Sequence, residues 1–209
     1  MRLLQHVGII PDGNRRWARS RGVSILEAYN RGYEVMKITV ERLADEGVKH
    51  ITMFAMSRDN CIRRGSFERE VLFKLVDRAL SDLRSGRYLR GYAFRVRVVG
   101  DLEMTTPRVR EAVESIRELE GELSLHVGLC YGAEWEEEIA RKGIEPLDGI
   151  PQIDLVIRTG GMQRLSDFFP SLVRYAELYF THTLWPDFNQ RELEEALAWF
   201  YSRRRNFGK

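Results

Sequence analysis

The sequence predicts an α/β fold with a mostly parallel central sheet of about six strands and helices on both faces. Short, β-branched apolar runs alternate with longer amphipathic stretches along the chain, and this β-α-β-α order is typical of parallel sheets. The composition, 44% hydrophobic and 31% charged residues, is that of a folded globular protein. With 209 residues, no linker and no internal repeat, residues 1–209 are interpreted as a single domain.

Six apolar runs are expected to form the strands, at residues 3–10, 50–56, 94–99, 123–130, 153–157 and 178–180. The first run stops at Pro11-Asp12-Gly13-Asn14, which is a strong turn signal. The last run is the shortest, and it is expected to form a short edge of the sheet. The predicted end of each strand therefore also identifies the loop residues that follow it.

Amphipathic periodicity predicts helices between the strands, at residues 14–17, 67–83, 133–141 and 191–201, with another that opens at Pro107. The longest helical pattern precedes the second strand and ends before Gly47. Its apolar residues are expected to form a core face: Leu26, Tyr29, Tyr33, Met36, Ile38, Val40 and Leu43. Residues 143–152 are typical of a loop.

The cysteine count and the apolar runs bear on the cellular compartment. Cys61 and Cys130 form neither a disulfide framework nor a zinc-binding spacing, so each is expected to be a small packed thiol. No apolar run reaches the roughly 20 residues that span a bilayer, and the first residues lack a signal-peptide core. We therefore expect a cytoplasmic protein.

Arginine dominates the basic residues. Lysine accounts for five of the 33 Lys and Arg residues, which leaves 28 arginines. Because 31 acidic residues bring the net charge to +2, and no aromatic RNA-binding motif is present, nucleic-acid binding is not expected. Most of the arginines are interpreted as surface residues paired with acids. A few suit phosphate, because the planar guanidinium grips two phosphate oxygens at once.

Ligands of an open parallel sheet bind beyond the carboxyl ends of its strands, so the residues after each strand are site candidates. They are Asp12-Gly13-Asn14-Arg15-Arg16, Ser57-Arg58-Asp59-Asn60 with Arg63, Gly100-Asp101, Tyr131-Gly132, and Arg158-Thr159-Gly160-Gly161 with Arg164 and Ser166. Arginines and glycines with approachable backbone N–H groups suit phosphate. A carboxylate among them, Asp12, suits one Mg²⁺ that keeps water and phosphate ligands. The sequence thus predicts a site for a substrate with one or two diphosphates.

Each of these features also has an ordinary structural interpretation. Asp12 fits a simple Pro-Asp-Gly turn, and residues 158–161 fit a strand-to-helix turn. His6, His50 and His126 lie in or beside strands, where a packed or surface role is favoured. The coincidence of several polar loops at one sheet edge, rather than any single residue, carries the prediction of a site.

Several segments resemble the cis-prenyltransferases, the family of undecaprenyl and dehydrodolichyl diphosphate synthases. The matching blocks run in order over nearly the whole chain: residues 6–18, 54–57 with Asn60 and Arg63, 99–102, Tyr131-Gly132, 154–168, 175–180 and 184–188. The resemblance implies transfer of an allylic prenyl group from its diphosphate to isopentenyl diphosphate, with Mg²⁺ as cofactor, a new cis double bond and release of pyrophosphate. It also implies an apolar tunnel, walled by helices after the first two strands, that shields the developing cation from water.

The resemblance assigns roles by position. The catalytic residues would be Asp12 and Asn60, and the metal ligands Asp12 and Glu177. The allylic diphosphate would contact Gly13, Asn14, Arg15, Arg16, Trp17 and Arg63, and the isopentenyl diphosphate Arg158, Arg164 and Ser166. A homodimer, with residues 177–188 near its interface, and peripheral membrane contact through a lipid product are implied as well.

Some positions depart from the family pattern. Many bacterial members have Arg and His where this chain has Ile25 and Tyr29, and Met162 and Asn206 replace an acid and an arginine. Other arginines could compensate: Arg19, Arg21, Arg31 or Arg64. Alternatively, the acceptor could be an alcohol rather than isopentenyl diphosphate. A further alternative is a non-catalytic subunit, which retention of Asp12 disfavours.

Overall fold

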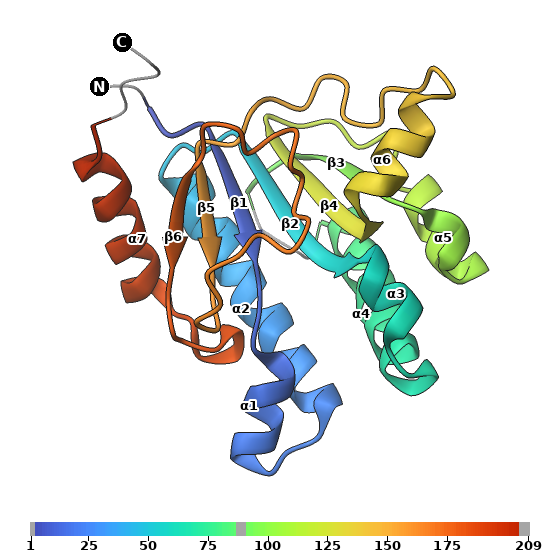
Figure 1. Ribbon diagram of the computed structural model, residues 1–209, viewed down its shortest axis with the longest axis horizontal. Helices are drawn as coiled ribbons and strands as arrows, with labels where there is room; N and C mark the ends of the chain where they lie inside the picture. Colours follow the sequence, from blue (N-terminus) through green and yellow to red (C-terminus); the bar gives the residue numbers. More distant parts are fainter. Residues whose placement is uncertain (1–2, 87–90, 205–209) are drawn as a thin grey trace.

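The computed structural model describes residues 3–86 and 91–204, which form a parallel sheet covered on both sides (Figure 1). Its strands are β1 (His6–Ile10), β2 (His50–Ser57), β3 (Phe94–Val99), β4 (Leu123–Tyr131), β5 (Leu155–Arg158) and β6 (Glu177–Phe180). Their order across the sheet is β3-β4-β2-β1-β5-β6, and every neighbouring pair is parallel. The predicted fold class, including the short sixth strand, is confirmed.

The helices connect and flank these strands. They are α1 (Asn14–Arg21), α2 (Ile25–Asp45), α3 (Arg58–Arg63), α4 (Ser66–Arg84), α5 (Pro107–Glu114), α6 (Ala133–Ala140) and α7 (Gln190–Ser202), with short 3₁₀ turns η1 (Leu102–Met104) and η2 (Trp185–Asp187). The sequence prediction missed α3, because six residues are too few to show a helical period. Its start is fixed by Ser57, whose side chain accepts a hydrogen bond from the backbone N–H of Asn60 at 3.2 Å.

Alternation along the strands gives the sheet two separate apolar faces. In β1, Ile9 packs into a cluster with α2, α4, α5 and α7, whereas the next residue, Ile10, packs on the other face. That second face is covered by α6 and by the segment that carries Phe168 and Phe169. Because strand side chains point alternately to opposite faces, the continuous apolar runs are those expected of strands buried on both sides.

Two details of the predicted core are wrong. Leu26 and Ile38 of α2 are about half exposed (50% and 49%) rather than part of its core face. Cys61 and Cys130 are not separate thiols: both are buried and form a disulfide that joins α3 to the end of β4. Their separation of 69 residues gives no local signal, so only the fold brings them together.

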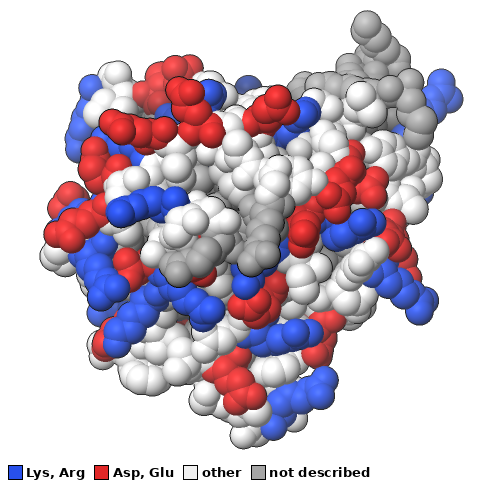
Figure 2. All heavy atoms as spheres, turned by 180° about the vertical axis from the view of Figure 1, so that it is seen from behind, with Lys and Arg blue, Asp and Glu red and all other residues white. Residues whose placement is uncertain are grey.

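The surface charges are mixed rather than gathered into a basic stripe. Figure 2 shows blue and red side chains interspersed over the face seen from behind. Arg42 of α2, for example, lies within 3.6 Å of Asp45, Glu46 and Glu194 carboxylate oxygens. Such exposed pairs each stabilise the fold by only about 0–1 kcal/mol. These residues account for part of the arginine excess without a binding role.

Candidate active site

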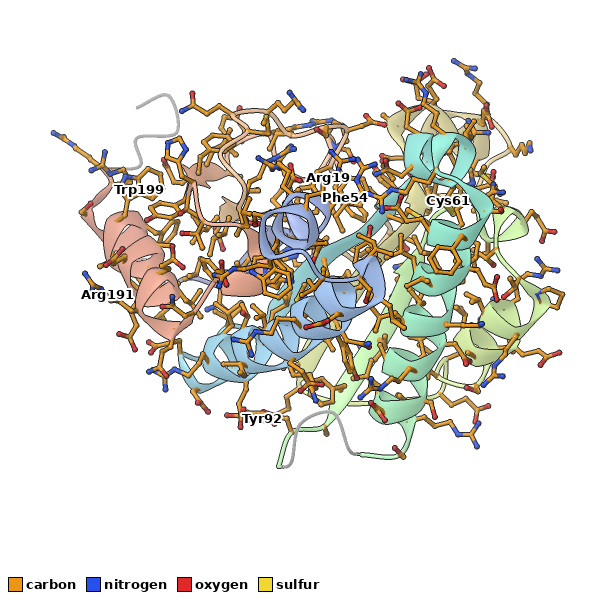
Figure 3. All side chains as sticks on the ribbon, turned by 90° about the horizontal axis from the view of Figure 1, so that it is seen from below. Arg19, Phe54, Cys61, Tyr92, Arg191 and Trp199 are labelled. Carbon is orange, nitrogen blue, oxygen red and sulfur yellow. A yellow bond between two sulfur atoms is a disulfide. The ribbon has the colours of Figure 1, made fainter. Side chains whose placement is uncertain are left out.

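A cavity with a volume of about 1030 Å³ opens at the carboxyl ends of β1, β2, β4 and β5. Figure 3 looks onto this end of the sheet, with α1 and α3 on either side of Phe54. Nine of the predicted site residues line the cavity: Asp12, Gly13, Asn14, Arg15, Arg16, Asn60, Arg158, Arg164 and Ser166. The parallel topology brings these residues together from the ends of three strands, β1, β2 and β5.

Asp12 lies between two arginines at the mouth of the cavity. Arg158, at the end of β5, donates from Nη2 to Asp12 Oδ2 at 2.9 Å. Arg16 Nη2 lies 3.3 Å from the other carboxylate oxygen, Oδ1. Arg158 is only 4% exposed, and a buried guanidinium is stable only when it is paired and hydrogen-bonded. The Asp12 carboxylate is therefore fixed in position by its neighbours before any ligand arrives.

A second loop completes the surroundings of Arg158. Its Nη1 donates to Ser166 Oγ at 2.9 Å and to the backbone carbonyl of Arg164. Its Nε is buried without a hydrogen-bond partner among the described residues. Ser166 has a positive φ of 51°, which is uncommon for a residue with a side chain and turns the loop toward Arg158. Unpaired N–H groups of this kind are costly unless an acceptor reaches them.

The start of α1 offers backbone donors to the same cavity. Gly13 precedes the helix at φ 115°, and no side chain caps the helix start. The first N–H groups of a helix lack intrahelical partners and carry partial positive charge, so they attract anions. A side chain on Gly13 would also collide with Leu184. Arg16 Nη1 donates to the carbonyl of Gly160 at 2.7 Å, which ties α1 to the loop after β5.

Away from this polar end, the cavity continues as an apolar tunnel between α2, α4 and the sheet. The side chains that line this part are mainly hydrophobic: Tyr33, Met36, Met53, Ala55, Leu72, Leu75, Val76, Ala79, Leu80, Leu83 and Val127. Tyr33 connects α2 to α4 along this wall, because its hydroxyl donates a hydrogen bond to Asp82 Oδ2 at 2.8 Å. The cavity therefore combines an anion-binding end with an apolar end.

Comparison with known proteins agrees with this geometry. A family model described as "Putative undecaprenyl diphosphate synthase" matches residues 10–145 and 136–208. A tritrans,polycis-undecaprenyl-diphosphate synthase (geranylgeranyl-diphosphate specific) from Aeropyrum pernix is 38% identical over 97% of both chains. The chain belongs to the cis-prenyltransferase family. As its relatives are named as polyprenyl diphosphate synthases, it is a prenyl-transferring enzyme.

Solved cis-prenyltransferase structures share the whole fold. The structure of lavandulyl diphosphate synthase from Lavandula x intermedia, in complex with dimethylallyl diphosphate, superposes with a TM-score of 0.87 at 30% identity and 98% coverage of each chain. A probable undecaprenyl diphosphate synthase from Campylobacter jejuni gives a TM-score of 0.80 at 28% identity, with both chains fully covered. The predicted family and fold are confirmed.

Three residues that the resemblance assigned to the site lie away from its cavity. Trp17 donates from Nε1 to Asp187 Oδ1 at 2.8 Å, so it joins α1 to η2. Arg63 points outward: its side chain is 78% exposed and pairs with Asp59 at 3.9 Å. Glu177 opens β6 in register with Leu155, at the opposite end of the sheet from Asp12. Asn206 lies outside the described residues.

Two site candidates without an assigned role, and one residue that sequence reasoning missed, also shape the cis-prenyltransferase site. Arg58 lies 3.7 Å from Asp101 and 3.6 Å from Glu138, so it links the start of α3 to the residue after β3 and to α6. Asp167 accepts a hydrogen bond from Ala133 N at 2.7 Å and so caps α6. Asp101 and Arg58 were candidates because both follow strands, whereas no sequence signal indicated the cap by Asp167.

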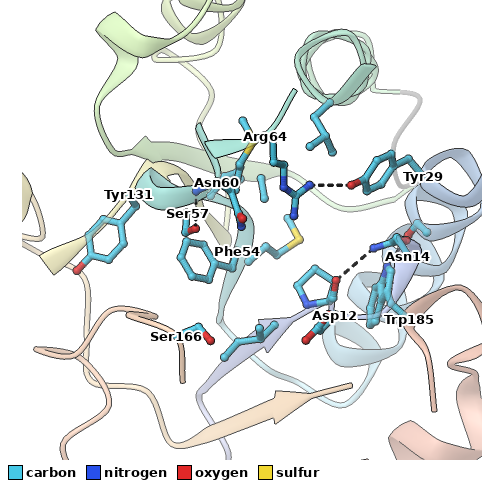
Figure 4. Close-up of a pocket in the computed structure, with 18 of the residues that line it drawn as sticks. Asp12, Asn14, Tyr29, Phe54, Ser57, Asn60, Arg64, Tyr131, Ser166 and Trp185 are labelled. Carbon is cyan, nitrogen blue, oxygen red and sulfur yellow. Dashed lines mark hydrogen bonds between the residues drawn. The ribbon is translucent and has the colours of Figure 1, made fainter. Parts of the chain in front are cut away.

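Figure 4 shows the polar end of the cavity, which also contains the side chain of Arg64. Arg64 enters from the end of α3 and bonds to the hydroxyl of Tyr29 on α2. Asp12 and Asn14 lie across the cavity from it (Figure 4). Among the arginines named as substitutes for missing contacts, Arg19 and Arg64 line the cavity, whereas Arg21 pairs with Asp187 at 3.3 Å.

No helix among residues 3–86 and 91–204 combines the length and the apolar character that a membrane crossing requires.

Proposed function

We propose that this enzyme transfers an allylic prenyl group from its diphosphate to isopentenyl diphosphate and releases pyrophosphate. The observation that carries the proposal is Asp12, held between Arg16 and Arg158 where the anion-binding end of the cavity meets the apolar tunnel. The C–O bond of the allylic diphosphate breaks, and its electron pair leaves with pyrophosphate. The acceptor alkene supplies the pair for the new C–C bond, and the acceptor then loses a proton to form the cis double bond.

The residues of this chain suit both halves of that reaction. Asn14, Arg15 and Arg16 begin α1, whose N–H groups stabilise the negative charge that builds on the departing pyrophosphate. Arg158 and Ser166, bonded to one another at 2.9 Å, are placed to bind the acceptor diphosphate. The apolar lining of the tunnel excludes water, which would otherwise capture the developing allylic cation.

Asp12 fits a magnesium ion. Among the described residues, no group of three or more His, Cys, Asp or Glu side chains forms a metal site. Mg²⁺ is usually held by one or two carboxylates together with water and substrate phosphates, so a single carboxylate beside two diphosphates suits it. Bound there, Mg²⁺ would neutralise charge on the leaving pyrophosphate. Within one chain, Glu177 is too far along the sheet to share that ion with Asp12.

We also propose a homodimer, contact with the membrane surface through the lipid product, and an allylic donor of about C20. The donor length follows the name of the Aeropyrum pernix relative, which is described as geranylgeranyl-diphosphate specific. Light scattering would test the dimer. In a dimer, Glu177→Gln tests whether that carboxylate acts from a second copy: metal dependence should then change along with turnover.

Mass spectrometry of the products tests the reaction. The purified chain is incubated with Mg²⁺, allylic diphosphates of increasing length and either isopentenyl diphosphate or a prenyl alcohol. We expect C5-extended cis products with isopentenyl diphosphate, and none when the metal is chelated. Met162 lines the cavity where an acid is usual in the family. Products with the alcohol but none with isopentenyl diphosphate would contradict the proposal and favour prenyl transfer to oxygen.

A further inference from the structure

Arg63 and Arg64 are adjacent at the end of α3 but point in different directions. Arg63 is 78% exposed and pairs only loosely with Asp59, at 3.9 Å. Arg64 is 17% exposed and lines the cavity, which Arg63 does not. Arg63 is the last residue of α3, whereas Arg64 follows it with an extended backbone (φ −72°, ψ 146°), so the two side chains leave the chain in different directions. The direction of the chain at the end of α3 therefore selects Arg64 as the arginine that reaches the site.

A hydrogen-bond chain holds Arg64 in this orientation. Arg64 Nη1 donates to the hydroxyl of Tyr29 at 2.7 Å and to Glu68 Oε1 at 2.9 Å. The Tyr29 hydroxyl donates in turn to the same Glu68 oxygen at 2.6 Å. Burial, the largest influence, raises the pKa of Tyr29 far above its ordinary value, so the hydroxyl keeps the proton that it donates. These three side chains come from α2, the end of α3 and α4, so the arginine is fixed from two helices.

Glu68 also connects this arginine to the start of α1. Arg15 Nε lies 3.9 Å from Glu68 Oε1, the same oxygen that Arg64 contacts. Two guanidinium groups therefore surround one carboxylate, which leaves a net positive charge at the wall of the cavity. The recorded bonds of Arg64 use Nη1, and its Nε is buried without a hydrogen-bond partner among the described residues. The guanidinium retains capacity for an anionic oxygen.

We infer that Arg64, rather than Arg63, is the α3 arginine that binds the diphosphate of the allylic donor, with Tyr29 and Glu68 as positioning residues. The inference rests on the proposed function and deepens that function by naming a residue that binds the donor. The link from Arg64 through Glu68 to Arg15, at the start of α1, places the contact on the donor side of the cavity, away from Arg158 and Ser166.

Steady-state kinetics of matched variants tests the inference. Arg64→Gln keeps most of the stem and removes the charge, so KM for geranylgeranyl diphosphate should rise about tenfold or more, because a charge-assisted bond is lost. KM for isopentenyl diphosphate and kcat should change much less. Arg64→Lys should recover part of the loss, since it restores charge without the planar fork. Tyr29→Phe should raise the donor KM by a smaller factor and leave kcat unchanged, which a general loss of structure would not do.

Two arginine variants make the comparison decisive. Arg191→Gln on α7, whose side chain is 87% exposed and pairs with Glu195, should behave like the unmodified enzyme. Arg63→Gln should raise the donor KM less than Arg64→Gln does. If Arg63→Gln has the larger effect, or if Arg64→Gln weakens isopentenyl diphosphate instead, the inference is wrong. Thermal unfolding of each variant confirms that it is folded.

Calorimetric titration with geranylgeranyl diphosphate, in the absence of any acceptor, separates this inference from the proposed reaction. If the unmodified chain binds this donor, Arg64→Gln binds it about tenfold more weakly, and no product forms with isopentenyl diphosphate, the inference stands and the proposed reaction fails. If the product forms but Arg64→Gln binds the donor normally, the reaction stands and the inference fails. No binding by the unmodified chain would overturn both.

Discussion

The two ends of the sheet both contain buried or partly buried ionisable groups, yet they differ in what those groups face. At the carboxyl end, Asp12 and Arg158 pair at 2.9 Å beside an open cavity. Toward the amino end, His6, His50 and His126 lie on adjacent strands with ring centroids 5.5–5.7 Å apart, and none of them lines that cavity. One end of the sheet thus contains a charged cluster beside a cavity. The other end contains a cluster of neutral histidines whose rings pack against one another.

The hydrogen bonds show why the histidines pack without a ligand. Both ring nitrogens of His6 are hydrogen-bonded: Nδ1 to the carbonyl of Pro151 at 2.9 Å and Nε2 to Thr52 Oγ1 at 2.7 Å. His50 Nδ1 lies 3.4 Å from His126 Nε2. No group of three such side chains in the described part of the chain is arranged to hold a metal. A buried ionisable residue is therefore a site candidate when it also lines a cavity, as Arg158 and Arg64 do and the three histidines do not.

The largest expected effect separates the two ends directly. Asp12→Asn keeps the size of the side chain but removes its charge, and with it the carboxylate proposed for Mg²⁺ and pyrophosphate. We expect kcat to fall by about 10³-fold, the loss typical of removing a group that stabilises developing charge. His126→Leu, at the other end, should retain kcat within about twofold of the unmodified enzyme. Comparable turnover losses in both variants would show that the distinction between the two ends is wrong.

The sequence was sufficient for the sheet but not for the orientation of individual side chains. Apolar runs and turn residues located the strands, because burial on both faces leaves a plain composition signal. The order of polar loops predicts that Asp12 and Arg158 lie at the same edge of the sheet, because parallel topology brings strand ends together. Nothing local distinguishes Arg63 from Arg64, since the residue at which α3 ends decides which side chain enters the cavity. The pairing of Cys61 with Cys130 likewise exists only in three dimensions.

That disulfide gives the second prediction, an effect on stability at the carboxyl end. It closes a loop of 69 residues between α3 and β4, and a cross-link of that span stabilises by roughly 4 kcal/mol in the chain-entropy view. We expect Cys61→Ser with Cys130→Ser, or a reducing agent on the unmodified chain, to lower the free energy of unfolding by about this amount in urea titrations. The double variant should no longer respond to the reductant. If the unmodified chain has the same urea unfolding midpoint with and without reductant, the disulfide does not contribute to stability.

The smallest effect sharpens the comparison from the histidine end, through pH. Burial, foremost, lowers the pKa of His6 to about 4 and of His126 to about 3, and it lowers the pKa of His50 as well. Asp154 opposes the shift at His6, whereas Arg95 and Arg97 add to the shifts at His50 and His126. In the unfolded chain, each would titrate near 6.5.

The unfolded state therefore binds more protons than the folded state between pH 6.5 and the lowered values. The contribution of these histidines to the free energy of unfolding is fully present above pH 6.5. Below that pH, the free energy of unfolding falls by roughly 1 kcal/mol for each of His6 and His126 over the first pH unit. Urea titrations from pH 7.5 to 5 would measure this slope, and His126→Leu should reduce it by about half. Since no histidine of this cluster faces the cavity, kcat measured where the protein stays folded should not follow the same curve. A shared pH profile for stability and turnover would instead mean that the two ends of the sheet act as one titrating unit.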